Sequence, residues 1–239
     1  MYDTIRLYHG SGGGAMQKLI REMFLKHFGN PVLDSLTDSA ILSPKHNTIS
    51  FTTDSYVVDP VFFPGGDIGK LSICGTVNDL AVSGAKPLWI SAGFVLEEGF
   101  PLNDLEKIVI SMAKEAKLAR VKIVTGDTKV VGKGKCDKIF INTSGIGILE
   151  KRFRRISFGR DVRPGDKILI NGTLGDHGIA VLNARESFQF NTSLQSDCAS
   201  LNRLIRNILK AVPGIRFMRD ATRGGLASIL CEMAEKWNK

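Results

Sequence analysis

The stretch "DIGKLSICGTVNDLAVSGAKPLWISAGFVL", residues 67–96, contains two elements that decide the fold. Residues 67–85 predict an apolar helix whose packing side carries the small residues Gly75 and Ala81. Small side chains at these positions would let another element approach closely. Residues 87–96 predict a strand. The stretch therefore predicts a helix that leads into a strand, with a close neighbour on its small-residue side.

Asn78 and Asp79 stand side by side inside this apolar helix. A carboxylate in a buried segment is costly unless positive charge meets it. We therefore expect a metal-bound nucleotide phosphate beside Asp79. Asn78 would donate to a phosphate or hold a water molecule.

The elements around this stretch alternate between helices and strands. We expect a helix over residues 15–28, a strand over 47–58, a helix over 103–119, and strands over 121–128 and 138–149. Asn103 is the expected N-cap of the third helix, with Glu106 as its capping-box partner. The alternation indicates an α+β or α/β class.

The character of the chain changes after a basic cluster that contains Lys151, Arg152, Arg154 and Arg155. We expect a domain boundary there, which gives domains 1–151 and 152–239. In the second region the sequence predicts a strand over 167–171, a helix from about residue 179, a helix over 200–210, and a loop that leads into a helix within 218–237.

Composition limits the classes of function. The chain has 239 residues, of which 43% are hydrophobic and 23% charged, as expected of a globular protein. Its net charge of +8 indicates either a solvated basic surface or attraction to an anionic ligand or acidic partner. The absence of an RNA-binding aromatic signature and of zinc-finger spacing argues against nucleic acid.

The four cysteines, Cys74, Cys136, Cys198 and Cys231, lie far apart and form no CxxC pair. This spacing argues against a zinc site and a disulfide framework, and it fits a reducing cytoplasm. The beginning of the sequence does not resemble a signal peptide, and no apolar stretch approaches membrane-spanning length.

Five aspartates occur in short, turn-like contexts beside small residues: Asp38, Asp54, Asp79, Asp127 and Asp220. Each alone is typical of a turn or a helix cap. Together they favour an oxygen-rich pocket for Mg²⁺, which binds a few carboxylates together with substrate phosphates.

Two common nucleotide-binding loops do not fit. "GGDIGKLS" lacks one of the four residues that a P-loop needs between its glycines, and Leu71 replaces the Ser or Thr. "HGSGGGA", residues 9–15, matches GxGxxA, but the strand before it is short and no clear second strand precedes an acidic residue. A glycine-rich flap whose backbone N–H groups approach phosphates is the better interpretation.

Several separated motifs carry a family resemblance: "TDSA", "TTDSYVVDPVFFPGGDIGKLSICGTVNDLAVSGAKPLWIS", "TGDTKVV" and "MRDATRGGL". They resemble the ATP-binding superfamily of aminoimidazole ribonucleotide (AIR) synthetase, selenophosphate synthetase and thiamine-monophosphate kinase. "HGSGG", "FFPGGDIGKL" and "GDTKVV" are most similar to its HypE family of hydrogenase maturation factors. The resemblance implies a two-domain, AIR-synthetase-like α+β fold. It also implies a homodimer formed through the N-terminal sheets, with ATP between the protomers.

The same resemblance implies roles for individual residues. The metal and phosphate ligands would be Asp38, Asp54, Asp79, Asp127 and Asp220. The catalytic residue would be Lys129. The nucleotide would lie near the mobile N-terminal residues His9, Gly10, Gly12 and Gly13, and near Asp67, Lys70, Asn78 and Thr128.

The implied reaction is an ATP-dependent dehydration. A HypF-like carbamoyltransferase would load a C-terminal cysteine thiol, and ATP would phosphorylate the carbamoyl oxygen. Loss of phosphate would leave a thiocyanate, whose cyano group reaches the iron of NiFe hydrogenase through a HypC–HypD complex. Phosphorylation converts a poor leaving group into a good one, so the protein mainly positions groups and neutralises charge.

The sequence departs from the family at its end, because Cys231 is not terminal. We expect Cys231 to pack inward beside Leu230 and Met233, and we expect a C-terminally truncated second domain with apolar surface exposed along residues 226–233. Two alternatives stay open. One is another enzyme of the superfamily, such as a small-molecule kinase or, less favoured without an N-terminal cysteine, a selenophosphate synthetase. The other is a non-catalytic dimerisation or docking remnant.

Overall fold

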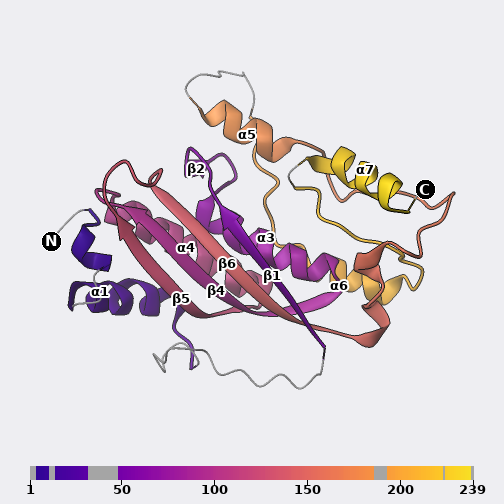
Figure 1. Cartoon of the computed structure of the whole chain (residues 1–239), viewed down its shortest axis with the longest axis horizontal. Helices are drawn as coiled ribbons and strands as arrows, with labels where there is room; N and C mark the ends of the chain where they lie inside the picture. Colours follow the sequence, from indigo (N-terminus) through magenta and orange to yellow (C-terminus); the bar gives the residue numbers. More distant parts are fainter. Residues whose placement is uncertain (1–3, 11–13, 32–47, 186–192, 223, 238–239) are drawn as a thin grey trace.

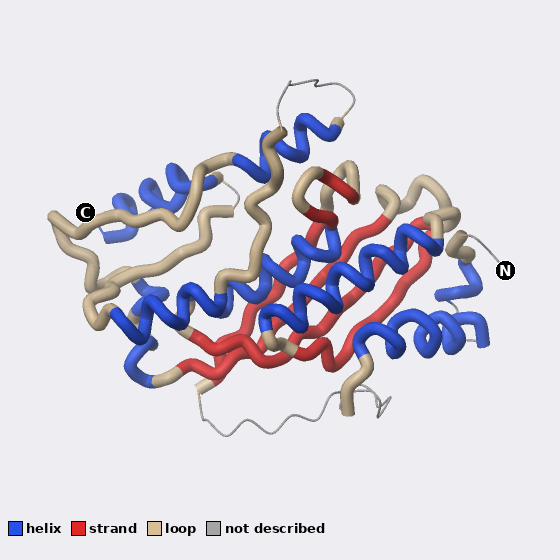
Figure 2. Tube along the Cα trace, turned by 180° about the vertical axis from the view of Figure 1, so that it is seen from behind, coloured by secondary structure: helices blue, strands red, loops and turns tan. Residues whose placement is uncertain are grey.

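A four-stranded sheet with helices on one face forms the centre of the molecule (Figures 1 and 2). The computed structural model describes residues 4–10, 14–31, 48–185, 193–222 and 224–237. The strand order is β1 (Ile49–Tyr56), β6 (Ile139–Leu149), β4 (Ala85–Glu97) and β5 (Lys122–Val131). β6 is antiparallel to both neighbours, whereas β4 and β5 are parallel. A small antiparallel pair, β2 (Phe62–Phe63) and β3 (Gly66–Asp67), lies beside it.

The helix α3 (Ile68–Val82) is the most buried helix that the structure describes. Apolar residues occur all around it, since it contacts the sheet on one side and α4 and α6 on the others. Its small residues allow this closeness, as predicted. A Cβ added at Gly75 would lie 2.3 Å from the Tyr56 hydroxyl oxygen, and Ala81 is fully enclosed in a second apolar cluster.

The N-terminal helix is continuous from residue 14 to 28, which confirms the prediction. It consists of α1 (Gly14–Leu19), the π-helical segment η2 (Ile20–Leu25) and α2 (Lys26–Phe28), and a short 3₁₀ turn, η1 (Leu7–Gly10), precedes it. Phe24 and Phe28 are buried, and the Phe24 ring lies 5.1 Å from the Phe94 ring of β4. These contacts fix the helix against the same face of the sheet as α4.

The predicted capping box of α4 (Leu102–Ala119) is wrong. The helix begins after Pro101, and the side chain of its N-cap makes no hydrogen bond. Asn103 therefore lies inside the first turn, where it cannot cap. Glu106 instead accepts hydrogen bonds from Lys26 and His27 of α2, at 3.3 and 3.4 Å. The proline, whose φ is fixed for helix entry, starts the helix before Asn103 is reached.

The second region contains the predicted helices but not the predicted strand. The helices are α5 (Asp176–Ala184), α6 (Asn202–Ala211) and α7 (Gly225–Trp237), with two 3₁₀ turns, η4 (Lys151–Phe153) and η5 (Ile156–Phe158), before them. Residues 167–171 are irregular, and Leu169 is 90% exposed. Nothing in the described part of the chain pairs with them, and an isolated strand is not stable in water.

α6 attaches the second region to the first. Its buried residues Ile205 and Leu209 pack with Ala81 of α3 and with Ile156. In Figure 1, α6 lies at the end of α3 where the 3₁₀ turns also lie. The second apolar cluster therefore joins the two regions across α3.

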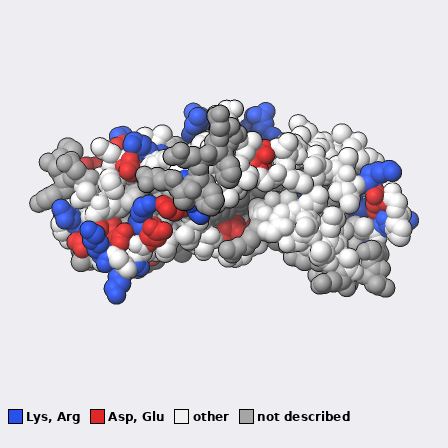
Figure 3. Space-filling view, turned by 90° about the horizontal axis from the view of Figure 1, so that it is seen from above, with Lys and Arg blue, Asp and Glu red and all other residues white. Residues whose placement is uncertain are grey.

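The inward packing expected of Cys231 is wrong, because this residue is exposed. Leu226, Ile229 and Met233 are partly buried on one side of α7, and helical spacing places Cys231 on the opposite side. Cys74 is buried, as predicted. Leu230 is exposed, as are Ile168 and Leu174. Figure 3 shows a mostly uncharged stretch of surface in the right half of the molecule, next to a group of charged side chains at its right-hand end.

No helix among the described residues is sufficiently long and apolar to cross a membrane.

Candidate functional site

Three of the predicted aspartates interact with one another, although they come from three separate parts of the chain. Asp54 lies on β1, Asp79 on α3, and Asp220 in the loop before α7. Alternation along β1 turns Thr52, Asp54 and Tyr56 toward α3, as their hydrogen bonds show. The strand and the helix thus present carboxylates to the same space.

Hydroxyl groups hold two of these carboxylates in place. Thr52 Oγ1 donates to Asp79 Oδ2 at 2.9 Å, and Thr76 Oγ1 donates to Asp54 Oδ2 at 3.1 Å. Thr76 also lies 2.6 Å from the hydroxyl of the buried Thr143 on β6, and 3.3 Å from that of Tyr56. Sequence analysis missed these residues, although the alternation of Thr52, Asp54 and Tyr56 along one strand face was a readable signal.

Burial and mutual repulsion raise the pKa values of all three carboxyl groups. The pKa of Asp79 rises to about 6, first through burial and then through Asp220. Burial, followed by Asp79, raises the pKa of Asp54, and burial is the main cause at Asp220. Carboxylates that are costly to ionise together favour a cation between them.

The donor set fits Mg²⁺ in its hydrated form. All three side chains offer hard oxygen ligands, and threonine hydroxyls leave other carboxylate lone pairs free. Within the described residues, no group of three His, Cys, Asp or Glu side chains is arranged to enclose a metal ion on its own. Mg²⁺ in proteins keeps several water ligands and also binds substrate phosphates, so it does not need a closed cage of protein side chains.

The raised pKa of Asp79 predicts a stability that depends on pH. The folded protein holds this proton up to a pH of about 6, whereas the unfolded chain releases it near the ordinary value of 3.8. The free energy of unfolding therefore falls as pH rises between these two values. Without metal at about pH 7.5, we expect Asp79→Asn to raise the free energy of unfolding by about 1 kcal/mol. This value is smaller than the full pKa shift would give, because Asp79 is only half-buried and solvent screens its charge.

Urea unfolding followed by circular dichroism checks this expectation at about pH 4 and pH 7.5. The gain should shrink to a small fraction at the lower pH, where Asp79 is protonated in the folded state and partly protonated in the unfolded chain. A gain of the same size at both pH values would show that ionisation of Asp79 is not its cause.

Asp127 and Lys129 lie on the other face of the sheet. One row of paired residues crosses the four strands, in the order Asp54, Thr143, Ala92 and Gly126. Neighbouring strands lie about 4.8 Å apart, so β1 and β5 are roughly 14 Å apart. Thr128 is buried on the helix-covered face beside Phe94. Its neighbours Asp127 and Lys129 are exposed and therefore project from the opposite face. One protomer does not bring Lys129 together with Asp79.

Asp67 and Lys70 stabilise the turn into α3. Asp67 is its N-cap, and Oδ1 accepts hydrogen bonds from the backbone N–H groups of Gly69 and Lys70 at 2.7 and 3.0 Å. Lys70 Nζ donates to the carbonyl oxygen of Gly65 at 2.9 Å. Gly65 has a φ of +92°, and its position leaves no room for a Cβ against the Ser196 backbone. In the structure, the side chains of Asp67 and Lys70 therefore both stabilise this turn.

Asn78 connects α3 to the segment before α6. Its Nδ2 donates to the Ala199 carbonyl oxygen at 3.0 Å, and its Oδ1 accepts from the Leu201 backbone N–H at 2.7 Å. Both ends of the amide are therefore engaged with backbone. The second N–H of Nδ2 is left for the predicted donation of Asn78 to a phosphate.

We expect Asn78→Ala to lower the free energy of unfolding by about 1–2 kcal/mol, because two backbone groups lose their partner. Thermal and urea unfolding measure the change. Asn103→Ala is the matched control, since Asn103 is exposed on α4. An unchanged stability in Asn78→Ala would mean that this connection contributes nothing in solution.

The N-terminal residues of the prediction are only partly described. His9 is buried in η1, where its Nδ1 accepts from the Arg6 backbone N–H at 2.9 Å. Gly10 is the last residue of η1. Gly12, Gly13 and Asp38 lie outside the described residues.

Comparisons with known proteins identify the family of this chain. Residues 36–149 match the N-terminal domain of the AIR synthase related proteins, and residues 163–238 match their C-terminal domain. Carbamoyl dehydratase HypE of Rhodobacter capsulatus is 52% identical over 98% of this chain and 68% of its own length. The chain thus spans about two thirds of this relative.

Two solved structures extend the comparison. The structure of hydrogenase maturation protein HypE in complex with ATP has a TM-score of 0.93 and 50% identity, over 98% of this chain and 69% of that one. A HypE–HypF complex has a TM-score of 0.76 and 52% identity, over 92% of this chain and 70% of that one.

Proposed function

Because the chain belongs to the HypE carbamoyl dehydratase family of AIR synthase related proteins, we propose that it binds ATP with Mg²⁺ and acts in hydrogenase maturation. The reaction is the ATP-dependent dehydration of a cysteine S-carboxamide to a thiocyanate, which supplies cyanide for the NiFe centre. The cluster of Asp54, Asp79 and Asp220 is the observation that carries this proposal, because a bound cation would remove the repulsion of these carboxylates at neutral pH.

In this proposal each side chain has a defined task. Asp54, Asp79 and Asp220 hold Mg²⁺, which neutralises the triphosphate and the charge that develops on the transferred phosphoryl group. Thr52 and Thr76 orient two of the carboxylates through the hydrogen bonds described above. Lys129 stabilises negative charge at the reacting groups, with Asp127 on the same face of β5, whereas the Thr128 side chain is buried on the opposite face. Asp38 and the segment from His9 to Gly13 contribute to the nucleotide pocket.

The open face of the sheet supports a homodimer. Phe51 is 65% exposed and Ile49 50% exposed on β1, and the helices cover only the opposite face (Figures 1 and 2). Exposed apolar surface on a sheet favours pairing with a second copy. Such pairing would place Lys129 of one protomer in the dimer interface. It would reach the partner's carboxylates around the edge strand β1, because these carboxylates lie on the helix-covered side of the sheet.

We further propose the division into domains 1–151 and 152–239, and a cytoplasmic location. A HypF-like carbamoyltransferase and a HypC–HypD complex are the proposed partners. The HypE–HypF structure, at 52% identity, supports the first of these partners.

Isothermal titration calorimetry with Mg-ATP tests the proposal directly. We expect saturable binding that requires Mg²⁺ and releases protons near pH 6, since cation binding ionises Asp79. Folded protein that shows no heat with Mg-ATP would contradict it. A protein that binds HypF-like partners but no nucleotide would favour the docking alternative.

A further inference from the structure

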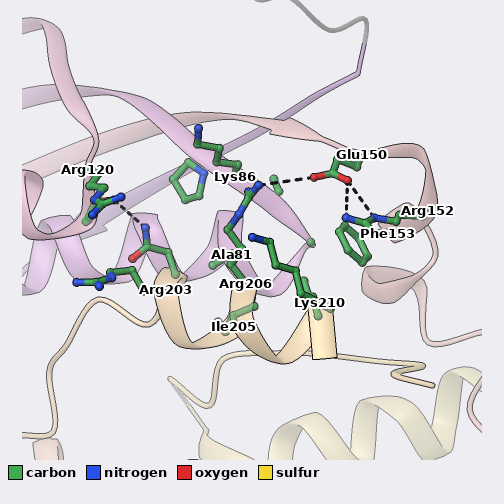
Figure 4. A pocket seen from close by; sticks show the side chains of 16 residues that line it. Ala81, Lys86, Arg120, Glu150, Arg152, Phe153, Arg203, Ile205, Arg206 and Lys210 are labelled. Atoms are coloured by element: carbon green, nitrogen blue, oxygen red, sulfur yellow. Dashed lines mark hydrogen bonds and ion pairs between the residues drawn. The ribbon is translucent and has the colours of Figure 1, made fainter. Parts of the chain in front are cut away.

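A basic pocket lies between the end of α3, the start of β4, the end of α4 and α6 (Figure 4). Its volume is about 210 Å³. Six basic residues line it, Lys86, Arg120, Arg152, Arg203, Arg206 and Lys210, and Glu150 is its acidic residue. The proposed nucleotide site does not use any of them.

The charges in this basic pocket are not balanced. Glu150 is shared by Arg152 at 2.9 Å and Arg206 at 3.9 Å. No ion pair in the described part of the chain involves the four remaining cations, Lys86, Arg120, Arg203 and Lys210. Figure 4 shows these four residues on β4, at the end of α4 and on α6. All six basic side chains are exposed, so water and salt weaken their mutual repulsion, and an anion bound between them would remove it.

Helix electrostatics explains only one of these cations. Lys210 lies in the last turn of α6, where positive charge is favourable. Arg203 lies in the first turn of the same helix, where positive charge is unfavourable and an anion would be stabilised. Arg120 has a φ of 60°, a conformation that glycine usually supplies at a helix end. Arg120 and Arg203 therefore both lower the stability of the folded state, which indicates that they have another role.

Asn202 lies in the wall of the basic pocket. Its Nδ2 donates to the Ala119 carbonyl oxygen at 2.7 Å, but its buried Oδ1 has no donor among the described residues. A buried acceptor without a partner is uncommon. Because this oxygen is closed to solvent, a ligand or water in the pocket would reach it only after a movement of the pocket wall.

We propose that the basic pocket binds a small, multiply charged anion of the phosphate class, about the size of diphosphate. Its volume is smaller than the roughly 300–1,000 Å³ of pockets for drug-sized ligands, so it would enclose a group of this size but not a whole nucleotide. The site is separate from the carboxylate cluster. Asp79 faces β1, whereas Ala81, which lines the pocket, packs toward α6 on the other side of α3.

Calorimetric titration with sodium diphosphate, in low salt with a chelator present, tests this inference. Removing divalent metal silences the proposed Mg-ATP site. We expect the double variant Lys86→Gln/Arg203→Gln to bind roughly 100-fold more weakly, since each charge-assisted contact contributes about tenfold. Lys114→Gln/Lys135→Gln is the matched control, because it removes the same charge from exposed positions outside the pocket and should bind as wild type.

Hydrogen–deuterium exchange then locates the anion. Protection should appear around residues 84–87, 119–120 and 202–206, and it should weaken as salt is added. Equal losses in both double variants would mean that only general positive charge attracts the anion, and the inference would be wrong. Absence of binding by wild type, or tighter binding of metal-free ADP at the same place, would also overturn it.

Discussion

Asp79→Asn is expected to weaken Mg-ATP binding by at least roughly 100-fold while the protein remains folded. Asp79 lies on a buried helix and is aimed by the Thr52 hydroxyl at 2.9 Å, so an amide in its place keeps the shape but removes the charge that meets the cation. Calorimetry with Mg-ATP measures the loss. The same substitution is expected to stabilise the metal-free protein, which separates lost binding from lost folding.

Asp137→Asn is the matched control for this result. Asp137 is an exposed carboxylate in the loop between β5 and β6, far along the chain from the cluster, and its loss should leave Mg-ATP binding unchanged. If Asp79→Asn bound Mg-ATP as wild type does, the carboxylate cluster would not be the metal site. The repulsion within it would then have to be relieved by protonation alone.

Much of the local structure could be predicted because its causes are local. The helix over residues 67–85 and the strand that follows it depend on apolar runs and turn residues within the segments themselves. The predicted cap of α4 was wrong for a local reason as well. Pro101 competes with Asn103 for the start of the helix, and the proline, with its φ already fixed, begins it.

Features that depend on distant partners could not be predicted from patterns. The strand expected over 167–171 has suitable residues but no neighbour to pair with among those described. Asn78 binds backbone more than a hundred residues away, at Ala199 and Leu201, so its structural role has no local signal. Which face of the sheet Lys129 occupies follows from strand order and register, and these emerge only when the sheet is assembled.

The position of Lys129 leads to the second large prediction, which concerns complementation between two inactive variants. With a carbamoylated cysteine peptide supplied as the acceptor, Lys129→Ala and Asp79→Asn should each abolish Mg-ATP-dependent phosphate release. If each site combines Asp79 of one protomer with Lys129 of its partner, a mixed dimer contains one intact site. Random pairing makes about half of the dimers mixed, so an equal mixture after subunit exchange should recover about a quarter of wild-type activity.

The double variant Asp79→Asn/Lys129→Ala, mixed with wild type, is the control that fixes the geometry. Its mixed dimers carry one changed residue in each site, so they should be inactive, and activity should fall to about a quarter at equal amounts. A site within a single protomer predicts the reverse pattern: no recovery in the first mixture, and half of wild-type activity in the second. The two mixtures therefore decide whether the open face of the sheet completes the site, because β5 cannot bring Lys129 to the helix-covered face of its own protomer without inverting its register.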